Sequence, residues 1–237
     1  MCLFSVLYKS KPVKVQSQVE YKLDRTAFKR HTAEEADDQL RYWLSRPPGE
    51  RLRAALRLNA IAWNYSPGNP PQLKKDIFKA RRRMRNESFY QDFLEFIQAL
   101  NNHKVEYLLV GGYAVILHGY TRTTGDMDIW VNPSAKNYNR LVKAFGEFGM
   151  PLFDMTEEHF LDTSKFDVFT FGVSPVSIDI MTRVKGLVFE AVFPNAASVE
   201  LDEGLLVRLI SLEDLLQAKQ ASGRAKDFDD IRHLNKE

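Results

Sequence analysis

The sequence predicts an α+β fold, in which a small mixed sheet is flanked by helices and preceded by a short basic helical region. Two observations support this prediction. After residue 105, short apolar runs with the alternation of strands are interspersed with segments whose apolar residues have helical spacing. Residues 1–85 carry helical patterns and 19 Lys and Arg against 8 Asp and Glu, whereas residues 86–237 carry 14 against 23. Opposite charges favour docking of the two parts, and they equally favour binding of a polyanion such as RNA by the first.

We divide the chain into a tail over residues 1–20, a basic helical region over 21–85 and a larger domain over 86–237. The best linker candidate is 66–71, where Ser, Pro and Gly cluster. The single cysteine, Cys2, excludes an internal disulfide and fits a reducing cytoplasm. No apolar run approaches the roughly 20 residues that span a bilayer, and the apolar N-terminus is too short for a signal peptide. We expect a cytoplasmic protein without a membrane partner.

Two helices are predicted in the basic region. Residues 32–35 form a capping-box pattern, so a helix should follow and end before Pro47. A second helix should start near Pro48, and its apolar residues recur at helical spacing as far as Trp63. We interpret the aromatic side chains of this pair as core rather than as platforms for nucleobases. The basic run over 74–85 is either a solvated helix face or a contact to a phosphate backbone.

The stretch over 105–131 organises the larger domain. An apolar run stops at Gly111 and Gly112, a short apolar helix follows, and a loop leads into a second apolar run that contains Asp126 and Asp128. Because glycine has no Cβ atom, the two glycines allow backbone N–H groups to approach a phosphate at the positive end of the helix. The stretch therefore combines a candidate phosphate loop with two candidate metal ligands.

The two aspartates carry the clearest chemistry. Residues two apart on a strand point to the same face, so Asp126 and Asp128 should project together, with Cα atoms about 7 Å apart. Side-by-side carboxylates repel each other, and a divalent cation relieves the repulsion. Oxygen-only ligands suit Mg²⁺ or Mn²⁺ rather than zinc. A third acid, Asp179, interrupts an apolar strand pattern over 176–181, where an unpaired charge would be costly without a neighbouring metal.

The remaining elements follow from the same patterns. We expect helices over 88–102 and 134–148 and strands over 166–171, 176–181, 188–193 and 205–210. The strands over 166–171 and 176–181 should form a hairpin that places Asp179 beside the strand of Asp126 and Asp128.

The loops and the C-terminus contain further candidate residues. Arg122 enters an acidic loop, where it can pair with the Asp126–Asp128 region or with a phosphate. His118 ends an apolar helix and is interpreted as a structural histidine. A helix should begin at Ser211, bear Lys219 and stop at Gly223. The last acids begin a terminal helix whose dipole they would favour, and they are Asp227, Asp229 and Asp230.

Taken together, these motifs resemble the minimal nucleotidyltransferases of the DNA polymerase β superfamily. Gly-Gly, Asp-x-Asp on a strand and an Asp on a later strand carry that likeness. Further matching residues indicate the AbiEii-like branch, known from toxin–antitoxin and phage-defence systems; they are Gly111-Gly112-Tyr113-Ala114, His118-Gly119, Arg122, Thr124, Asp126, Asp128, and the segments Leu212 to Lys219 and Gly223 to Asp230. The likeness covers roughly residue 87 to the C-terminus. One departure is that the second glycine replaces a serine common across the wider superfamily, a change that this branch tolerates.

The resemblance implies a role for each of these residues. Asp126, Asp128 and Asp179 would bind Mg²⁺ or Mn²⁺, and Asp179 would also orient or deprotonate the attacking hydroxyl. The nucleoside triphosphate would be held by Gly111 and Gly112, with further contacts from the loop and from the C-terminal helices, namely Arg122, Thr124, Lys219 and Lys226. The two lysines would be phosphate contacts or structural contacts.

The activity implied is metal-dependent transfer of a nucleoside monophosphate from an NTP to a hydroxyl of an RNA, such as a tRNA, or of a protein acceptor. A bacterial toxin–antitoxin setting would add a cognate toxin or antitoxin as a partner. Two alternatives remain open. The chain could be a catalytically inactive, antitoxin-like binding module, or a nucleotidyltransferase that acts on a small molecule in an enclosed acceptor pocket.

Overall fold

The computed structural model describes residues 39–66, 89–173, 176–201 and 204–235. These residues belong to one compact unit, Asp38–Glu237, so the helices that precede residue 66 and the later sheet are parts of the same body. The predicted tail over 1–20, the capping box over 32–35, most of the linker and the basic run over 74–85 lie outside the described residues.

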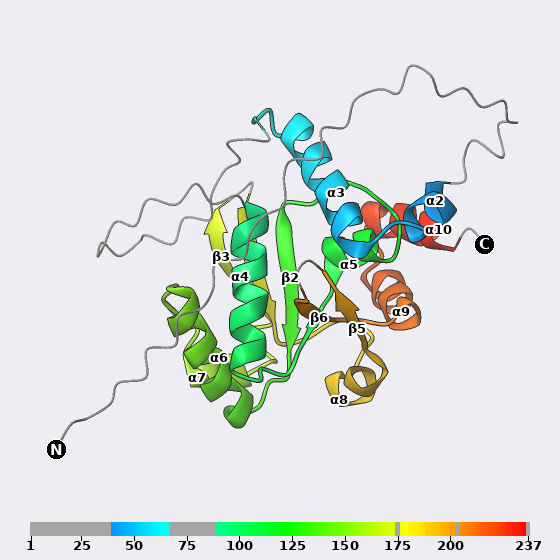
Figure 1. Ribbon diagram of the computed structural model, residues 1–237. Coiled ribbons are helices and arrows are strands. Elements are labelled where there is room, and N and C mark those ends of the chain that lie inside the picture. Colours follow the sequence, from blue (N-terminus) through cyan, green and yellow to red (C-terminus); the bar gives the residue numbers. More distant parts are fainter. Residues whose placement is uncertain (1–38, 67–88, 174–175, 202–203, 236–237) are drawn as a thin grey trace, which may run out of the picture. The chain divides into compact units, whose positions relative to one another are not determined.

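The described strands form a six-stranded mixed sheet in the order β3-β4-β2-β1-β6-β5 (Figure 1). Their bounds are β1 Tyr107–Leu109, β2 Asp126–Val131, β3 Val168–Val173, β4 Val176–Met181, β5 Ala197–Glu200 and β6 Leu206–Leu209. β2 pairs in parallel with β4 and β1 with β6, whereas the β1–β2, β3–β4 and β5–β6 pairs are antiparallel. The α+β class with a mixed sheet and flanking helices is confirmed, and so is the hairpin that brings β4 beside β2.

The register divides the central strands into an apolar face and a polar face. Met127 of β2 lies opposite Ile178 of β4, which lies opposite Phe171 of β3, and all three are buried. The ring of Phe171 packs against Phe145 of helix α6, with centroids 4.8 Å apart. Because side chains alternate between faces, the neighbouring row must face away from that helix. The aspartates therefore lie on the face opposite the one that α6 covers.

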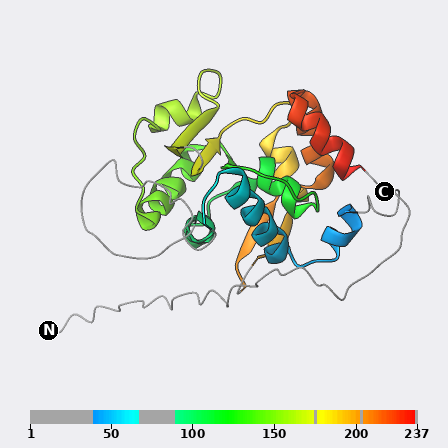
Figure 2. The same ribbon diagram turned by 90° about the horizontal axis from the view of Figure 1, so that it is seen from above.

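Helices cover both faces of the sheet. α4 (Phe89–Asn102) and α6 (Ala135–Phe148) pack against each other over the apolar face, joined by the edge-to-face contact of Phe96 with Phe145. Toward the opposite face lie the short α5 (Gly111–Leu117) and the C-terminal helices α9 (Leu212–Ser222) and α10 (Ala225–Leu234). Figure 2 shows α5 between α3 and the C-terminal pair, and α5 contacts both α3 and α9.

The predicted helix ends are formed by local hydrogen bonds. Ser134 caps α6 by accepting from the backbone N–H of Asn137, and Ser211 caps α9 by accepting from that of Asp214. Gly223 ends α9 with φ at 69°, a left-handed conformation that glycine adopts without strain. Both serine caps and the glycine stop were predicted from sequence and are confirmed.

Three elements between β2 and α9 differ from the prediction. Residues 188–193 were expected to form a strand, but Phe189–Val192 form the helical turn α8, followed by the 3-10 turn Phe193–Asn195. Phe189 and Val192, three apart, share the buried side of that turn, so its apolar residues follow helical spacing. The helix α7 (Glu157–Leu161) and the edge strand β5 were not predicted.

The helices before residue 66 correct a second expectation. α2 (Gln39–Leu44) and α3 (Pro48–Ala62) form as predicted, and Leu52 and Ala55 of α3 are buried. Tyr42 and Trp63, however, are 49% and 48% exposed, so interpreting them as core residues was wrong. The reason at Trp63 is that α3 ends there, and the chain turns at once through Asn64 in a left-handed conformation.

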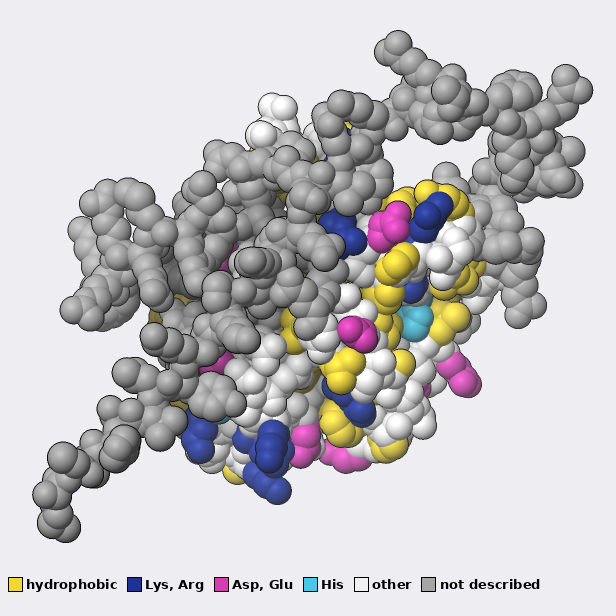
Figure 3. All heavy atoms as spheres, in the orientation of Figure 1, with side chains coloured by type: hydrophobic (Ala, Val, Ile, Leu, Met, Phe, Trp, Pro, Cys, Tyr) yellow, Lys and Arg dark blue, Asp and Glu magenta, His cyan; other side chains and the backbone are white. Residues whose placement is uncertain are grey.

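The described residues contain no long apolar helix, and their surface carries charges of both signs. No helix among the described residues is both long and apolar enough to cross a bilayer. On the face drawn in Figure 3, Lys and Arg side chains stand beside Asp and Glu side chains, with apolar groups between them. The predicted basic run, which would supply a one-sign surface, falls outside the residues described.

Candidate active site

Three aspartates meet on the polar face of the sheet. β2 and β4 run in parallel with Asp128 opposite Asp179 and Asp126 opposite Ser177. Paired residues of adjacent strands are separated by about 4.8 Å and point to the same face. Asp126 and Asp128 share that face as well, because they are two apart on β2. The structure therefore brings together the three carboxylates that the sequence singled out, which we call the open carboxylate cluster.

Within the described residues, no direct ion pair balances the charge of this cluster. No Lys or Arg of the described segments forms an ion pair with Asp126, Asp128 or Asp179. Burial, followed by the charge of Asp179, raises the pKa of Asp128 from its ordinary 3.8 to about 6. Burial also raises the pKa of Asp179, although a hydrogen bond with Thr170 opposes the shift. One oxygen of Asp179, Oδ1, is buried without a hydrogen-bond partner among the described residues.

The glycine pair packs directly against this cluster. A Cβ atom on Gly111 would lie 1.8 Å from Oδ2 of Asp128, and one on Gly112 would lie 2.2 Å from the hydroxyl of Thr124. Gly111 also has a φ of +61°. The glycines are therefore required for close packing whether or not a phosphate binds, a reason that sequence reasoning did not supply. The backbone N–H of Gly112 donates to Oδ2 of Asp128 at 3.4 Å, so it faces the aspartate.

The loop between α5 and β2 is fixed by α3. Asn59 donates from its amide nitrogen to the carbonyl oxygen of Thr124 at 2.6 Å, and its amide oxygen accepts from the backbone N–H of Thr124 at 3.0 Å. These two hydrogen bonds resemble those exchanged by a pair of residues on neighbouring strands, and Asn59 is almost fully buried. A helix from the basic region thus helps to build the candidate site, which the sequence did not indicate.

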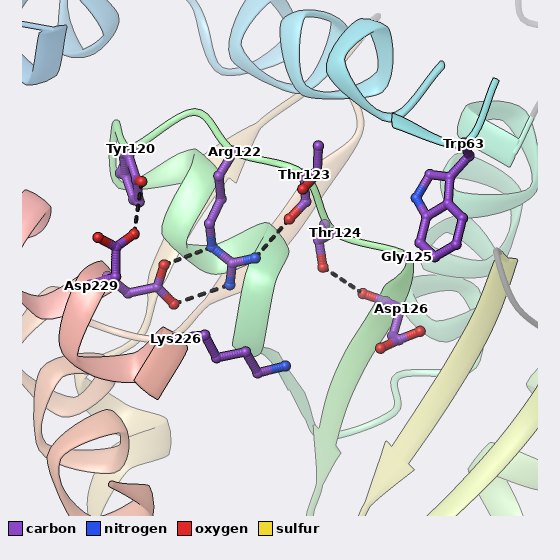
Figure 4. Close-up of a pocket in the computed structure, with 10 residues that line it drawn as sticks. Trp63, Tyr120, Arg122, Thr123, Thr124, Gly125, Asp126, Lys226 and Asp229 are labelled. Atoms are coloured by element: carbon purple, nitrogen blue, oxygen red, sulfur yellow. Dashed lines mark hydrogen bonds and ion pairs between the residues drawn. The ribbon is translucent and has the colours of Figure 1, made fainter. Parts of the chain in front are cut away.

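A cleft of about 480 Å³ opens beside the first aspartate, within the size range of small-molecule sites (Figure 4). Its lining comes from the end of α3, the loop before β2, the start of β2 and α10, and consists of Trp63, Tyr120, Arg122, Thr123, Thr124, Gly125, Asp126, Lys226, Asp229 and Asp230. The exposed Lys226 extends from α10 toward the β2 side of the cleft. Its charge also opposes the raised pKa values of Asp128 and Asp179.

A second group of acids lies close by, and cations neutralise it. The ammonium of Lys219, 5% exposed, is 2.6 Å from Asp230 and 3.3 Å from Asp227. Arg122 contacts Asp230 through Nε at 2.6 Å, and Arg224 contacts Asp227 through Nε at 2.7 Å. We call these five residues the paired carboxylate cluster. It ties the loop before β2 to α9 and α10.

This arrangement revises three expectations. Arg122 pairs with Asp230 rather than with the Asp126–Asp128 strand. Of the two roles expected for Lys219, the geometry gives the structural one, since its ammonium lies buried between two carboxylates. Asp227 lies in the first turn of α10, as predicted, and accepts from the backbone N–H of Arg224, but Asp227 and Asp230 are also fully buried ion-pair partners. Of the helix acids, Asp229 is exposed and accepts a hydrogen bond from the hydroxyl of Tyr120 at 2.9 Å.

His118 has the structural role predicted for it. Its Nε2 lies 2.9 Å from the carbonyl oxygen of Ile210, and burial lowers its pKa, which favours the neutral ring. The imidazole therefore links the end of α5 to the residue after β6.

The donor set of the open carboxylate cluster suits a hard divalent cation. The described residues contain no ready-made group of three or more His, Cys, Asp or Glu side chains that could hold a metal ion. One oxygen of Asp126 instead accepts the hydroxyl of Ser177 at 2.9 Å. Mg²⁺ is usually held by only one or two carboxylates, together with water and substrate phosphates. The raised pKa of Asp128 and the unpartnered oxygen of Asp179 therefore fit a cation that arrives with its substrate.

Comparison with known proteins adds no further information. No protein-family model matches the chain, and no curated protein matches it either.

Proposed function

We propose that this protein is a metal-dependent nucleotidyltransferase, which transfers a nucleoside monophosphate from an NTP to a hydroxyl of an RNA or protein acceptor. One observation carries the proposal. Asp128 and Asp179 stand opposite each other on parallel strands, with Asp126 on the same face and no ion-pairing Lys or Arg among the described residues. Three acids so placed destabilise the fold unless a bound cation neutralises their charge.

The chemistry assigned to these residues is a single displacement at the α-phosphorus of the NTP. A bond forms from the acceptor oxygen to this phosphorus, and the bond from the phosphorus to the bridging oxygen of the leaving pyrophosphate breaks. The acceptor proton passes to Asp179, whose burial favours its protonated form. Lys226 would contact the triphosphate from the opposite side of the cleft, because its ammonium is exposed there.

Asp126 and Asp128 would hold the Mg²⁺ or Mn²⁺. When bound, the cation would neutralise charge on the attacking and leaving oxygens. The contact of Gly111 and Gly112 with the triphosphate stays a prediction, since the N–H of Gly112 is directed at Asp128. Thr124 is placed at the cleft, with its backbone fixed by Asn59.

The test is transfer of label from each α-labelled NTP in the presence of Mg²⁺, with total tRNA or a cell lysate as acceptor. We expect label on RNA or protein with the unaltered chain and none with the Asp126→Ala/Asp128→Ala variant. Asp154→Asn is the matched control, because that side chain is 89% exposed and lies outside the cleft. Label on a small molecule would favour a nucleotidyltransferase that acts on a small molecule, and undiminished transfer by the double variant would contradict the mechanism.

A second candidate function, a non-catalytic and antitoxin-like binding module, is favoured by one observation. The described residues hold no group of three acids, histidines or cysteines arranged for a metal. Occupation of the cleft by residues 74–85 would also favour this function, but these residues lie outside the described part of the chain. Binding of NTP or of a protein partner with no transfer under any nucleotide would identify this function.

A further inference from the structure

Trp63 lines the cleft and has no role in the proposed chemistry. Trp63 ends α3 beside the loop that leads to β2, and Figure 4 shows its indole extending downward from α3 near Gly125 and Asp126. The side chain is 48% exposed, which is unusual for the largest apolar side chain. It forms no ring pair with any aromatic side chain in the described part of the chain. A broad aromatic surface is thus presented to the cleft.

The backbone of Trp63 is held firmly at this position. Its N–H donates to the carbonyl oxygen of Asn59 at 2.8 Å, and the N–H of Tyr65 donates back to the carbonyl oxygen of Ala60 at 3.0 Å. Asn59, one helical turn before Trp63, is the residue that clamps Thr124. The same turn of α3 therefore holds both the backbone of Trp63 and the loop that precedes Asp126.

The other two tryptophans differ from Trp63. Trp130 is 1% exposed and packs edge-on against Phe189 in the core. Trp43 is partly buried on α2, where it contacts the ring of Tyr42 at 5.1 Å and does not line the cleft. Trp63 alone among the three tryptophans combines exposure with a place in the cleft.

We propose that the indole of Trp63 is the stacking platform for the base of the bound nucleoside triphosphate and makes the site prefer purine over pyrimidine nucleotides. The inference rests on the proposed function and deepens it by naming the substrate class. Stacking on an aromatic face makes no hydrogen bonds to the edges of a base. The affinity therefore depends on the area of the base, which is larger for a purine than for a pyrimidine. With the phosphates near Lys226 and Asp126, the base would reach toward the end of α3.

The test compares binding of Mg²⁺-ATP, Mg²⁺-UTP and Mg²⁺-tripolyphosphate, which carries no base, by isothermal titration calorimetry. We expect ATP to bind more tightly than UTP, and Trp63→Ala to weaken ATP binding about ten-fold or more. Tripolyphosphate affinity should be unchanged by that substitution. Trp63→Phe, which keeps an aromatic face, should retain most of the affinity and the purine preference.

Tryptophan fluorescence supplies an independent readout of the same contact. ATP should quench the emission of the unaltered protein and of the Trp43→Phe control, and Trp63→Phe should abolish the quenching. Equal ATP affinity of Trp63→Ala and the unaltered protein, with tripolyphosphate still bound, would overturn this inference alone. If neither ATP nor tripolyphosphate binds any variant, the proposed function fails, and the inference fails with it.

Discussion

Two clusters of aspartates border the cleft, one through Asp126 of β2 and the other through Asp230 of α10, and their negative charge is balanced in opposite ways. The paired carboxylate cluster surrounds its two acids with one lysine and two arginines, all within 3.3 Å. Burial would raise the pKa of Asp227, but hydrogen bonds from Arg224 and Ser222 and the charge of Lys219 outweigh it and lower the pKa to about 2. In the open carboxylate cluster the pKa of Asp128 rises to about 6.

The comparison separates a structural site from the proposed functional one. A buried acid that is neutralised by fixed cations adds a cross-link between elements, here between the loop before β2 and the last two helices. Acids that are buried without such cations weaken the fold, and a protein retains them where a ligand can supply the missing charge. Substitutions in the two clusters should therefore differ in their effects on activity and stability.

Asp128→Asn should abolish nucleotidyl transfer and leave the fold intact. Losing the proposed metal ligand would remove several kcal/mol of transition-state stabilisation, equivalent to a rate loss of about a thousand-fold or more. The amide keeps the shape of the side chain and removes the charge that repels Asp179, so the metal-free variant should unfold no earlier than the unaltered protein. Transfer rates and thermal unfolding of one preparation measure both effects. A soluble, folded variant with normal turnover would remove Asp128 from the mechanism.

Lys219→Met should strongly destabilise the protein. The substitution leaves Asp227 and Asp230 buried without their shared ammonium, and breaking a buried pair in this way costs about 3–5 kcal/mol. Lys226→Met is the matched control, because Lys226 is exposed on the neighbouring helix and forms no ion pair within the described segments. Urea denaturation compares the free energies of unfolding. If the two variants lost equal stability, the structural role of the paired cluster would be wrong.

The two clusters should produce opposite pH dependences in the metal-free protein. Since the folded pKa of Asp128 is about 6 against an ordinary 3.8, the folded state binds more protons than the unfolded state between these values. The contribution of Asp128 to the free energy of unfolding therefore falls by about 2 kcal/mol as the pH rises from 4 to 6. Asp227 behaves in the reverse sense, because its pKa is lowered to about 2. Its stabilisation is present above pH 4 and is lost as the pH falls toward 2.

Denaturation at several pH values between 3 and 7 measures this dependence. In the Asp128→Asn variant the decline between pH 4 and 6 should flatten, while the loss of stability toward low pH should persist. An unchanged decline in that variant would show that Asp128 is not its cause.

The smallest effect is expected at Arg224. Its side chain is 60% exposed, so its ion pair with the buried Asp227 is largely screened by solvent. Arg224→Ala should cost about 1 kcal/mol or less in free energy of unfolding, far less than Lys219→Met. A loss as large as that of the lysine variant would show that the exposed cation, not the buried one, stabilises the cluster.

The sequence predicted those features of the two clusters that depend on local patterns of residues. Alternation in Asp126 to Val131 predicted which face the acids share, and the hairpin logic placed Asp179 beside them. The ion pairs of Asp230 with Arg122 and Lys219 join residues 108 and 11 positions apart, and no local pattern specifies them. Trp63 was misassigned because helical spacing does not show where a helix ends. Strand β5 was missed because it lies at the sheet edge and is mostly exposed, so it lacks alternation.

Direct binding of Mn²⁺, followed by electron paramagnetic resonance with and without ATP, tests the central claim that the open carboxylate cluster takes its missing charge from a bound cation. We expect the unaltered protein to bind Mn²⁺ weakly alone and much more tightly with ATP. Asp128→Asn should lose this binding, whereas Asp154→Asn should keep it. Absence of Mn²⁺ binding by the unaltered protein with ATP, or equal binding by Asp128→Asn, would show that the open carboxylate cluster does not bind a cation.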